Sequence, residues 1–536
     1  MQMLQDVNYF FERPDILGFQ VTGSDLIVNV VIFSLIISWC VYIWNRRHYE
    51  KLASKIPGPP AYPIVGSMLQ FIGKPRYIIK QINKLIDTYG GEPFKLWFCG
   101  CLTVVISKPE DVQIILNSSK ALQKSFLFNF GKLLLGDGLF TAPVDKWRIH
   151  RRMLSPAFKT ENLRKMFFPV IVENSEALIR DLKKQLNETQ PFNLLDYVSD
   201  TTFRTIYQTT LGCNFDIEPK VEAEFKKLFD RAVELISERL FKPWLYPDFI
   251  YSIYSKFTGQ QNVYKNAQKL PNYMIDEMKK MYAENKTTKK ANINCTADVT
   301  VDDEKKKLKV YMDILMELNE SGNHKLSDED FKSEVITILG AGIETTSSTI
   351  CFCILLLAIH QDIQDKVYDE IYKILGDNKT ITFEDTANFV YLKQVIQETL
   401  RLFPLTLAFM KEIQDDIKIF SGNYVLPKGT TCLICPLAIH YLPTLYPNPR
   451  SFNPGNFDSE NIAKRNKYSF IAFGGGKRNC IGEKFAMLNM IVFIATFLRN
   501  YSVHTDIKFN DIKLKIRVIM TSKSGYPVTI RPRHQK

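Results

Sequence analysis

The sequence lacks the glycine-rich fingerprint by which proteins bind a flavin or nicotinamide dinucleotide. Its glycine run, Gly474-Gly475-Gly476, is too short, and no strand–turn–helix pattern surrounds it. No internal repeat and no nucleic-acid-binding module is recognisable either. The chain is therefore not expected to carry its own flavin or nicotinamide, and its basic charge needs a different explanation.

Paired cysteines are also scarce, although the 536 residues include ten cysteines. Cys432-x-x-Cys435 lies in a strand-like run and has no second pair that would complete a metal site. A disulfide framework is typical of small secreted chains rather than of a large cytosolic body. We therefore expect free thiols and no metal at Cys432 and Cys435.

Acidic residues are in the minority, with 57 Asp and Glu against 69 Lys and Arg, a net charge of +12. A basic balance suits an anionic membrane surface or an acidic protein partner. Length alone suggests about three domains. We instead expect one large fold behind an N-terminal segment.

The N-terminal segment contains an uncharged run at residues 26–45, which as a helix of about 30 Å would cross a bilayer. Basic residues follow the run and mostly acidic residues precede it, so the positive-inside bias places the body in the cytoplasm. A cleaved signal peptide fits poorly, because the charge order is reversed and no small-residue cleavage site follows. The interpretation is a lumenal N-terminus at 1–25, an anchor at 26–45, a basic and proline-rich linker at 46–60 and a catalytic domain at 61–536.

The most informative stretch runs from Phe473 to Gly482 and holds Cys480 in a turn between a glycine run and a helical pattern. Gly476 and Gly482 suit a turn that needs positive φ, and backbone N–H groups of such a turn can point at sulfur. Phe473 would cover the sulfur. This arrangement is typical of a thiolate presented to a haem iron, where it favours O–O cleavage.

A second informative segment is an all-round apolar helix that begins after Ser327 and extends to about His360. Glu344 and Thr345 are costly in a buried helix and so require a reason. Ala341, Gly342 and Thr345 share one face, where small residues would leave room for dioxygen. We expect Thr345 to hydrogen-bond there and relay protons, with Glu344 next in line to solvent; the bland alternative is a hydroxyl bonded back to its own helix.

Phe473-x-x-Gly476-x-Arg478-x-Cys480-x-Gly482 resembles the haem-binding signature of the cytochrome P-450 superfamily, and the resemblance extends from about Pro57 to the C-terminus. It implies a mainly α fold with small segregated β-sheets and a haem b held by Cys480. The implied reaction is a monooxygenation in the endoplasmic reticulum membrane, with a single-pass anchor. Trp147-Arg-Ile-His-Arg-Arg resembles insect members of the animal fatty-acid ω-hydroxylase-like clan.

The resemblance also implies roles for individual residues. Trp147 and Arg151, four apart on one helical face, and Arg478 would contact the haem propionates, with Lys411 as a weaker candidate. An aromatic segment from Leu240 to Tyr251 would roof the cavity and dip toward the membrane. The substrate pocket would be apolar and lined by Ile338, Ala341, Leu405, Leu407 and Ile519.

The chain departs from the family pattern at two positions. Ala341 replaces an acid that bonds covalently to haem in the ω-hydroxylase branch, so we expect haem without that bond. Glu398 and Arg401 would form the family's buried ion pair, but Asn456 stands where its third partner is an arginine. This replacement should alter the strength of that structural element without changing the fold.

Electrons for such a reaction must come from another protein. The resemblance implies NADPH-cytochrome P-450 reductase, with cytochrome b5 as a further partner, and lipophilic substrates such as fatty acids, terpenoids or foreign compounds. An acidic partner would meet a basic face formed by Arg148, Arg152, Lys477 and Lys484. Two alternatives remain: a haem-thiolate isomerase or dehydratase of peroxides, and a non-enzymatic haem or lipid carrier.

Overall fold

The computed structural model separates the chain into two units, Met1–Ile56 and Pro57–Lys536. The described residues are 23–62, 65–71, 73, 75–98, 100–188, 190–212, 217–293, 311–320, 326–377 and 379–533.

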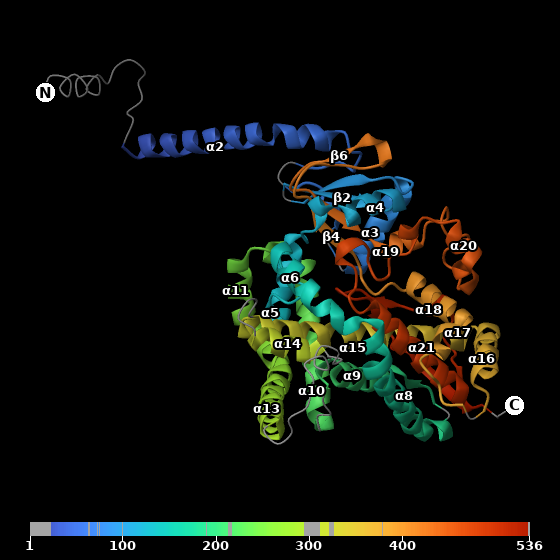
Figure 1. Ribbon diagram of the computed structural model, residues 1–536. Coiled ribbons are helices and arrows are strands. Elements are labelled where there is room, and N and C mark those ends of the chain that lie inside the picture. Colours follow the sequence, from blue (N-terminus) through green and yellow to red (C-terminus); the bar gives the residue numbers. More distant parts are fainter. Residues whose placement is uncertain are drawn as a thin grey trace, which may run out of the picture. The chain divides into compact units, whose positions relative to one another are not determined.

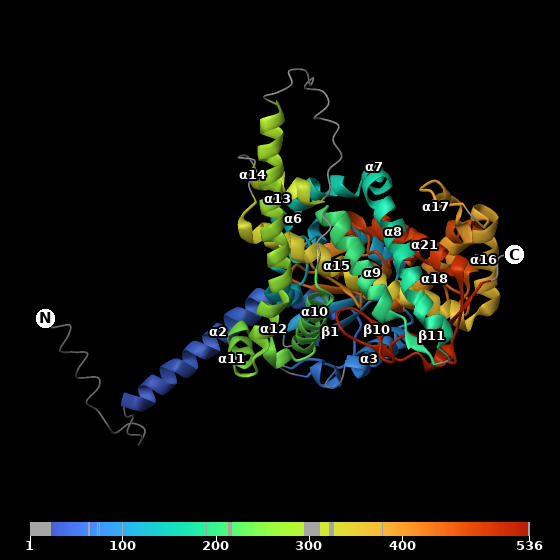
Figure 2. The same ribbon diagram turned by 90° about the horizontal axis from the view of Figure 1, so that it is seen from below.

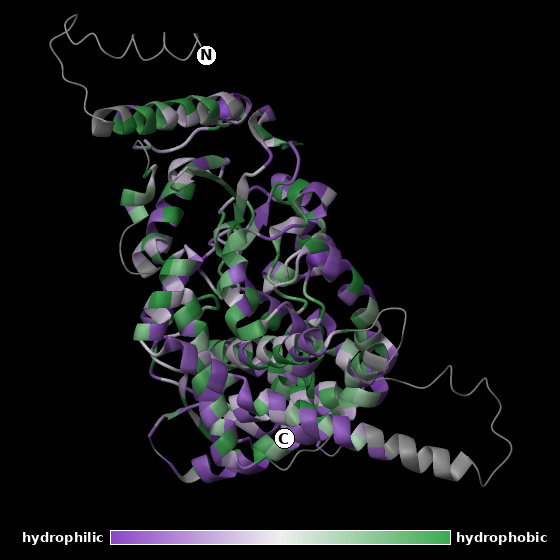
Figure 3. Cartoon of the chain, turned by 90° about the vertical axis from the view of Figure 1, so that its left-hand side faces the viewer, coloured by the Kyte–Doolittle hydropathy of each residue, from purple (hydrophilic) through white to green (hydrophobic). Residues whose placement is uncertain are grey.

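The first unit contains helix α2 (Gly23–Ser54), whose middle exposes a nearly continuous set of large apolar side chains from Ile27 to Trp44. Figure 3 shows this helix as mostly hydrophobic, with hydrophilic residues toward its carboxyl end. By length and composition, the helical segments Ile27–Val41 and Arg46–Ser54, bent by 53°, together qualify as a candidate membrane span. The predicted lumenal segment 1–25 lies outside the described residues except for its last three residues, which belong to α2.

The second unit is built around helix α15 (Asp328–Ile359), which is apolar on nearly all sides and therefore buried. It begins where the Ser327 hydroxyl accepts a hydrogen bond from the backbone N–H of Asp330, with three acids in the first turn. Its apolar window also passes the length test for a membrane span, but 78% of that window is buried, which identifies a core helix. Figures 1 and 2 both show α15 among the other helices of this unit.

Helices α9, α18 and α21 contact α15, and α8 contacts α9 and α21. Together with α15 they form the main apolar core. The other helices of the second unit are α3 (Pro75–Thr88), α4 (Pro109–Asn117), α5 (Lys132–Leu135), α6 (Val144–Leu154), α7 (Thr160–Asn162), α8 (Phe168–Leu182), α9 (Leu195–Leu211), α10 (Pro219–Leu240), α11 (Asp248–Phe257), α12 (Gln260–Ala267), α13 (Lys269–Ile293), α14 (Tyr311–Glu320), α16 (Gln361–Leu375), α17 (Asp385–Asn388), α18 (Val390–Leu402), α19 (Pro436–His440), α20 (Ser459–Ala463) and α21 (Glu483–Asn500).

The β-structure is confined to small separate sheets. The largest has the strand order β1-β2-β7-β4, with β2 and β7 parallel and the other pairs antiparallel. Its strands are β1 (Phe94–Phe98), β2 (Cys101–Ile106), β7 (Thr431–Ile434) and β4 (Phe409–Glu412). The smaller sheets comprise β3 (Phe192–Asn193), β11 (Pro527–Pro532) and β8 (Tyr501–His504); β9 (Leu514–Lys515) and β10 (Thr521–Ser522); and β5 (Ile417–Lys418) and β6 (Val425–Leu426). The mainly helical architecture with segregated sheets is as predicted.

Two local expectations were wrong. The run from Ile417 to Val425 reads as one strand, but it folds into β5 and β6, joined by a turn in which Gly422 has φ 59°. The polar, lysine-rich stretch from about Glu284 to Lys307 is predicted to be a surface loop, yet α13 continues to Ile293, and residues 294–307 lie outside the described residues. Polar composition does not prevent a helix whose first turns are held by tertiary packing.

The seven cysteines that the structure describes are free. Cys432 lies in β7 opposite Val104 of β2 and is buried, and burial raises the pKa of its thiol. Among the described residues no group of three or more His, Cys, Asp or Glu side chains could hold a metal ion.

Candidate active site

The cysteine loop is shaped by two glycines in the left-handed region. Gly474 has φ 74° and Gly476 has φ 65°, and a Cβ on Gly476 would lie 1.9 Å from the carbonyl oxygen of Leu116. The backbone N–H of Cys480 donates to the carbonyl of Phe473 at 2.9 Å, which closes the loop. Gly482 was expected to share the positive φ, but its φ is −92°, so that part of the prediction was wrong.

The groups around the Cys480 sulfur combine burial with two influences that favour a thiolate. Burial, and to a smaller extent the charge of Glu483, raises the pKa of the thiol, whereas the backbone N–H of Gly482 and the charge of Arg151 lower it. Cys480 is nevertheless exposed as a residue. Gly482 also precedes α21, whose N-terminus adds a positive dipole end. This donor set fits a sulfur that bonds a metal as its anion.

Helix α6 brings the predicted pair Trp147 and Arg151 to this loop. Arg151 Nη1 donates to the carbonyl oxygen of Asn479 and Nη2 to its Oδ1, each at 2.8 Å. The guanidinium of Arg478 lies 4.8 Å from the Trp147 ring and donates to the carbonyls of Leu122 and Ala142 at 3.0 and 2.8 Å. The four-residue spacing in α6 therefore places both predicted residues beside the loop.

Helix α6 is itself fixed to α15 by a buried group of three side chains. His150 Nδ1 lies 2.7 Å from Glu334 Oε1, and the Tyr311 hydroxyl donates to Glu334 Oε2 at 3.0 Å. All three side chains are buried. Because Trp147 and Arg151 flank His150 on α6, this contact sets their position relative to α15.

A cluster of cations lies next to the loop and includes one residue that sequence reasoning missed. Lys124 pairs with Lys411 of β4 through a β-bridge, and both lie close enough to Arg478 to be affected by its charge. Burial, followed by Arg478, lowers the pKa of Lys411 to about 8, and burial also lowers the pKa of Lys124. Lys124 and Lys411 are 287 positions apart, so no local motif could have shown their contact.

This cluster supplies the test of whether the residues fit a haem. Among the described residues, no carboxylate is found among the groups that act on the charges of Lys124, Lys411 and Arg478. Buried cations are costly without anions. The two propionate carboxylates of a haem b would provide that charge, and the Cys480 thiolate would bind its iron. The residues present therefore fit the group.

Helix α15 carries Ala341 and Thr345, and its Thr345 hydroxyl is bonded back to its own helix, which is the alternative named above for this residue. Ala341 is exposed in the middle of an otherwise buried helix, and the Thr345 hydroxyl donates to the Ala341 carbonyl at 2.6 Å. Gly342 was expected to leave room for dioxygen, but a Cβ there would lie 2.5 Å from Ile206 of α9. Gly342 thus permits close packing of α15 on α9.

Glu344 is not simply the next group toward solvent. Its Oε1 accepts a hydrogen bond from Arg517 Nη2 at 3.0 Å, while its Oε2 has no partner among the described residues. Burial raises the pKa of Glu344 to about 6, and the charge of Arg517 limits that rise. The sequence pattern contained no sign of Arg517, which lies 173 residues downstream.

The predicted structural pair is formed and completely buried. Arg401 Nε and Nη2 donate to the two carboxylate oxygens of Glu398 at 2.7 Å, and Asn456 Nδ2 adds bonds at 3.1 and 3.3 Å. Asn456 therefore takes the third position with a neutral amide. The backbone N–H of Asn453 also donates to Glu398, at 2.9 Å.

The remaining predicted residues are those of the substrate pocket and of the basic face. Ile338 and Leu405 are buried, Leu407 and Ile519 are partly exposed, and Ile519 pairs with Thr406 through a β-bridge. The residues expected to form a basic face are all exposed: Arg148, Arg152, Lys477 and Lys484. Their roles in binding stay predictions.

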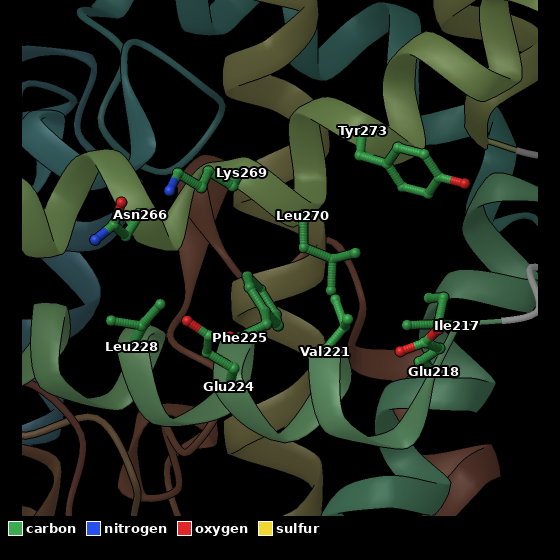
Figure 4. A pocket seen from close by; sticks show the side chains of 10 residues that line it. All are labelled: Ile217, Glu218, Val221, Glu224, Phe225, Leu228, Asn266, Lys269, Leu270 and Tyr273. Carbon is green, nitrogen blue, oxygen red and sulfur yellow. The ribbon is translucent and has the colours of Figure 1, made fainter.

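A separate pocket of about 530 Å³ lies between α10 and the α12–α13 region. Figure 4 shows Val221 and Phe225 of α10 near Leu270, and Leu228 of the same helix below Asn266. None of the predicted site residues lines this pocket. It is therefore distinct from the site around Cys480.

Comparison with known proteins places these observations in a family. A family model described as Cytochrome P450 matches residues 56–529. Cytochrome P450 4c3 of Drosophila melanogaster is 32% identical, over 96% of this chain and 96% of that protein. Cytochrome P450 4c21 of Blattella germanica is 31% identical over 95% and 99%, and human Cytochrome P450 4V2 is 30% identical over 88% and 89%.

Proposed function

The chain belongs to the cytochrome P450 family and is a haem monooxygenase, and we propose that it is membrane-anchored, with Cys480 as its iron ligand. Its resemblance to the animal ω-hydroxylase-like clan agrees with the insect and mammalian relatives. The single observation that carries the assignment of Cys480 is the environment of its sulfur, which receives the Gly482 N–H and the charge of Arg151.

When bound, the haem supplies the cleavage of dioxygen and the insertion of one oxygen atom into a C–H bond, and its thiolate ligand favours that cleavage. The chain's own residues would hold the group. Cys480 provides sulfur, and Arg478, Lys124 and Lys411 provide the charge that two propionates need. Trp147, beneath the Arg478 guanidinium, and Arg151, bound to Asn479, would keep this side of the site in place.

Thr345 and Glu344 would handle protons on the other side. The Thr345 hydroxyl holds its hydrogen on the Ala341 carbonyl, from which it can turn toward the exposed face beside Ala341. Glu344 follows directly and, with a pKa of about 6, exchanges protons near neutral pH. Because Ala341 has no carboxyl group, the haem would be held without an ester to this helix.

Two apolar surfaces support the membrane association. One is α2, with the proposed anchor at 26–45. The other follows α10, where Trp244, Phe249 and Phe257 are more than half exposed. We propose a lipophilic substrate, location in the endoplasmic reticulum membrane, and electrons from NADPH through cytochrome P-450 reductase, with cytochrome b5 as a second donor. The exposed basic residues of α6 and the cysteine loop suit such acidic partners.

The assignment of Cys480 is tested by replacing it with alanine. Cys480→Ala should abolish the thiolate-type spectrum of the reduced carbon monoxide complex, whereas Cys435→Ala should leave it unchanged. The measurement is the absorption spectrum together with the haem content of purified protein. An unaltered spectrum in Cys480→Ala would remove this residue as the ligand.

Reductase and NADPH dependence separates the monooxygenase from the two alternatives. An isomerase or dehydratase of peroxides would act without reductase, and a carrier would show no substrate-dependent oxygen uptake. Retention of Glu344-Thr345 argues against both, because an acid and a hydroxyl in the middle of an apolar helix have no evident use there.

A further inference from the structure

Three charged side chains from three distant parts of the chain meet beside the middle of α15. Arg517, in the segment between β9 and β10, contacts Glu344 of α15 and Asp230 of α10. The Arg517 side chain is 7% exposed and that of Glu344 16%, whereas Asp230 is 49% exposed. The guanidinium thus links a nearly buried carboxylate to one at the surface.

The segment that carries Arg517 is held at several points. The backbone N–H of Val518 donates to the Ser237 hydroxyl of α10 at 3.0 Å, and the N–H of Met520 donates to the carbonyl of Leu405 at 2.9 Å. These bonds fix the backbone that directly follows Arg517. Arg517 therefore reaches Glu344 from a defined position rather than from a free loop.

The contact between Glu344 and Arg517 leaves one hydrogen-bonding atom of each side chain unused. Glu344 Oε2 and Arg517 Nε are both buried without a hydrogen-bond partner among the described residues. A bidentate pair would use both oxygens. Here a single hydrogen bond joins Glu344 to Arg517, and the cation also serves Asp230. One oxygen of Glu344 is left available to bind a proton.

We propose that Arg517 is a positioning residue for Glu344, holding its carboxylate by one oxygen and dividing its charge between Glu344 and Asp230. The proposal deepens the proposed function, because it rests on Glu344 and Thr345 handling protons. Arg517 would keep Glu344 anionic and oriented between turnovers. Asp230 draws part of the cation's charge away, so that Glu344 can still accept a proton.

The charged groups around Glu344 predict in which direction each variant should shift the pKa of Glu344. Arg517 and Lys515 lower the pKa of Glu344, Asp230 raises it, and burial is the largest cause of its rise to about 6. Glu234 also affects Arg517 and pairs with Lys515, and the Tyr526 hydroxyl is affected by Glu344. Removing Arg517 and removing Asp230 should therefore move the titration of Glu344 in opposite directions.

The experiment is an infrared titration of the full-length, haem-loaded resting protein. Subtraction of the Glu344→Gln spectrum isolates the Glu344 carboxyl band. We expect a midpoint near pH 6 in the parent protein, a midpoint higher by about one to three pH units in Arg517→Met, and a lower one in Asp230→Asn. Arg517→Lys should restore most of the parent value.

Arg231→Met is the matched control, because Arg231 is a cation of α10 that pairs with Glu234 and Glu238. Its Glu344 midpoint should stay near the parent value. The ratio of product to NADPH, followed against pH, should shift in the same order as the infrared midpoints. A purely structural role of Arg517 would change stability without this ordered shift.

The proposal is overturned if Arg517→Met and Asp230→Asn both keep the parent midpoint, or if Asp230→Asn raises it. Asp230 is half exposed, so its variant remains informative even if Arg517→Met does not fold. Failure of the proposed function would look different. In that case the parent would show no reductase-dependent product, or Glu344→Gln would leave the ratio of product to NADPH unchanged, while the infrared shifts persisted.

Discussion

Two carboxylate–guanidinium pairs in this protein use the same chemistry but differ in how many of their hydrogen-bonding atoms have partners. The Glu398–Arg401 pair has no exposed side-chain surface at all. The Glu344–Arg517 pair is slightly exposed and leaves one carboxylate oxygen unbonded. The comparison separates a contact that holds the fold from one that can change its protonation.

The first pair is surrounded by donors and acceptors on every side. Arg401 also donates to the carbonyls of His440, Pro449 and Ser451 at 2.9, 2.6 and 3.0 Å. A buried ion pair offsets its desolvation only when its remaining hydrogen-bonding capacity is met in this way. The Glu398–Arg401 pair therefore joins α18 to the segment around residue 450.

The Glu344–Arg517 pair has fewer hydrogen-bond donors around its carboxylate. Burial raises the pKa of both glutamates, but Glu398 receives an ion pair, an amide and a backbone N–H that oppose the rise. For Glu344 the main group that opposes the rise is Arg517, whose charge is shared with Asp230. The lesson is that the number of donors around a buried carboxylate separates a structural role from one in proton exchange.

The largest effect is expected for Arg401→Leu, which leaves the Glu398 charge buried without its cation. The loss in free energy of unfolding should be about 3–5 kcal/mol, with a fall in haem content. Urea unfolding measures it, and Arg450→Leu, an exposed position, should change stability by less than about 0.5 kcal/mol. If Arg401→Leu were as stable as Arg450→Leu, the structural role of the pair would be refuted.

A smaller effect is expected for Asn456→Ala, which removes the amide donor shared by the two Glu398 oxygens. A hydrogen bond to a buried carboxylate contributes about 1.5–3 kcal/mol. Thermal unfolding should show the loss. Asn500→Ala removes an exposed amide that bonds only its own helix and is the control. Equal melting temperatures for the two variants would mean that Asn456 does not support the pair.

The smallest effect is the pH dependence of stability due to Glu344. Its pKa in the folded protein, about 6, is above the usual 4.5, so protonation favours the folded state. The contribution is fully present below pH 4.5 and is lost as pH rises through 6. Glu344→Gln should therefore become more stable relative to the parent by about 1–2 kcal/mol between pH 4.5 and pH 7. Chemical unfolding at the two pH values measures this difference, and a constant difference would contradict the raised pKa.

Much of the fold and of the cysteine loop was accessible from the chain alone. The helix after Gly482, the start of α15 at Ser327 and the end of α18 before Pro404 all follow from local caps, glycine and proline. The family and the helical fold class are confirmed. The roles of Cys480, Thr345 and the propionate contacts stay predictions.

The errors share one cause. Gly482 was assigned a left-handed turn and Gly342 a place beside dioxygen, but a glycine serves either backbone freedom or close packing, and sequence does not distinguish them. Likewise the lysine-rich stretch after 284 reads as a loop although α13 includes its first part.

Order along the chain was sufficient for whatever depends on near neighbours: the loop that presents Cys480, the pairing of Glu398 with Arg401 three residues later, and the buried character of α15. Folding in three dimensions was needed to bring Lys124 to Lys411, 287 residues apart, and Arg517 to Glu344, 173 residues apart. The reason is that spacing encodes which side chains share a turn or a face, whereas the charge that a buried group meets depends on whichever distant segment packs against it.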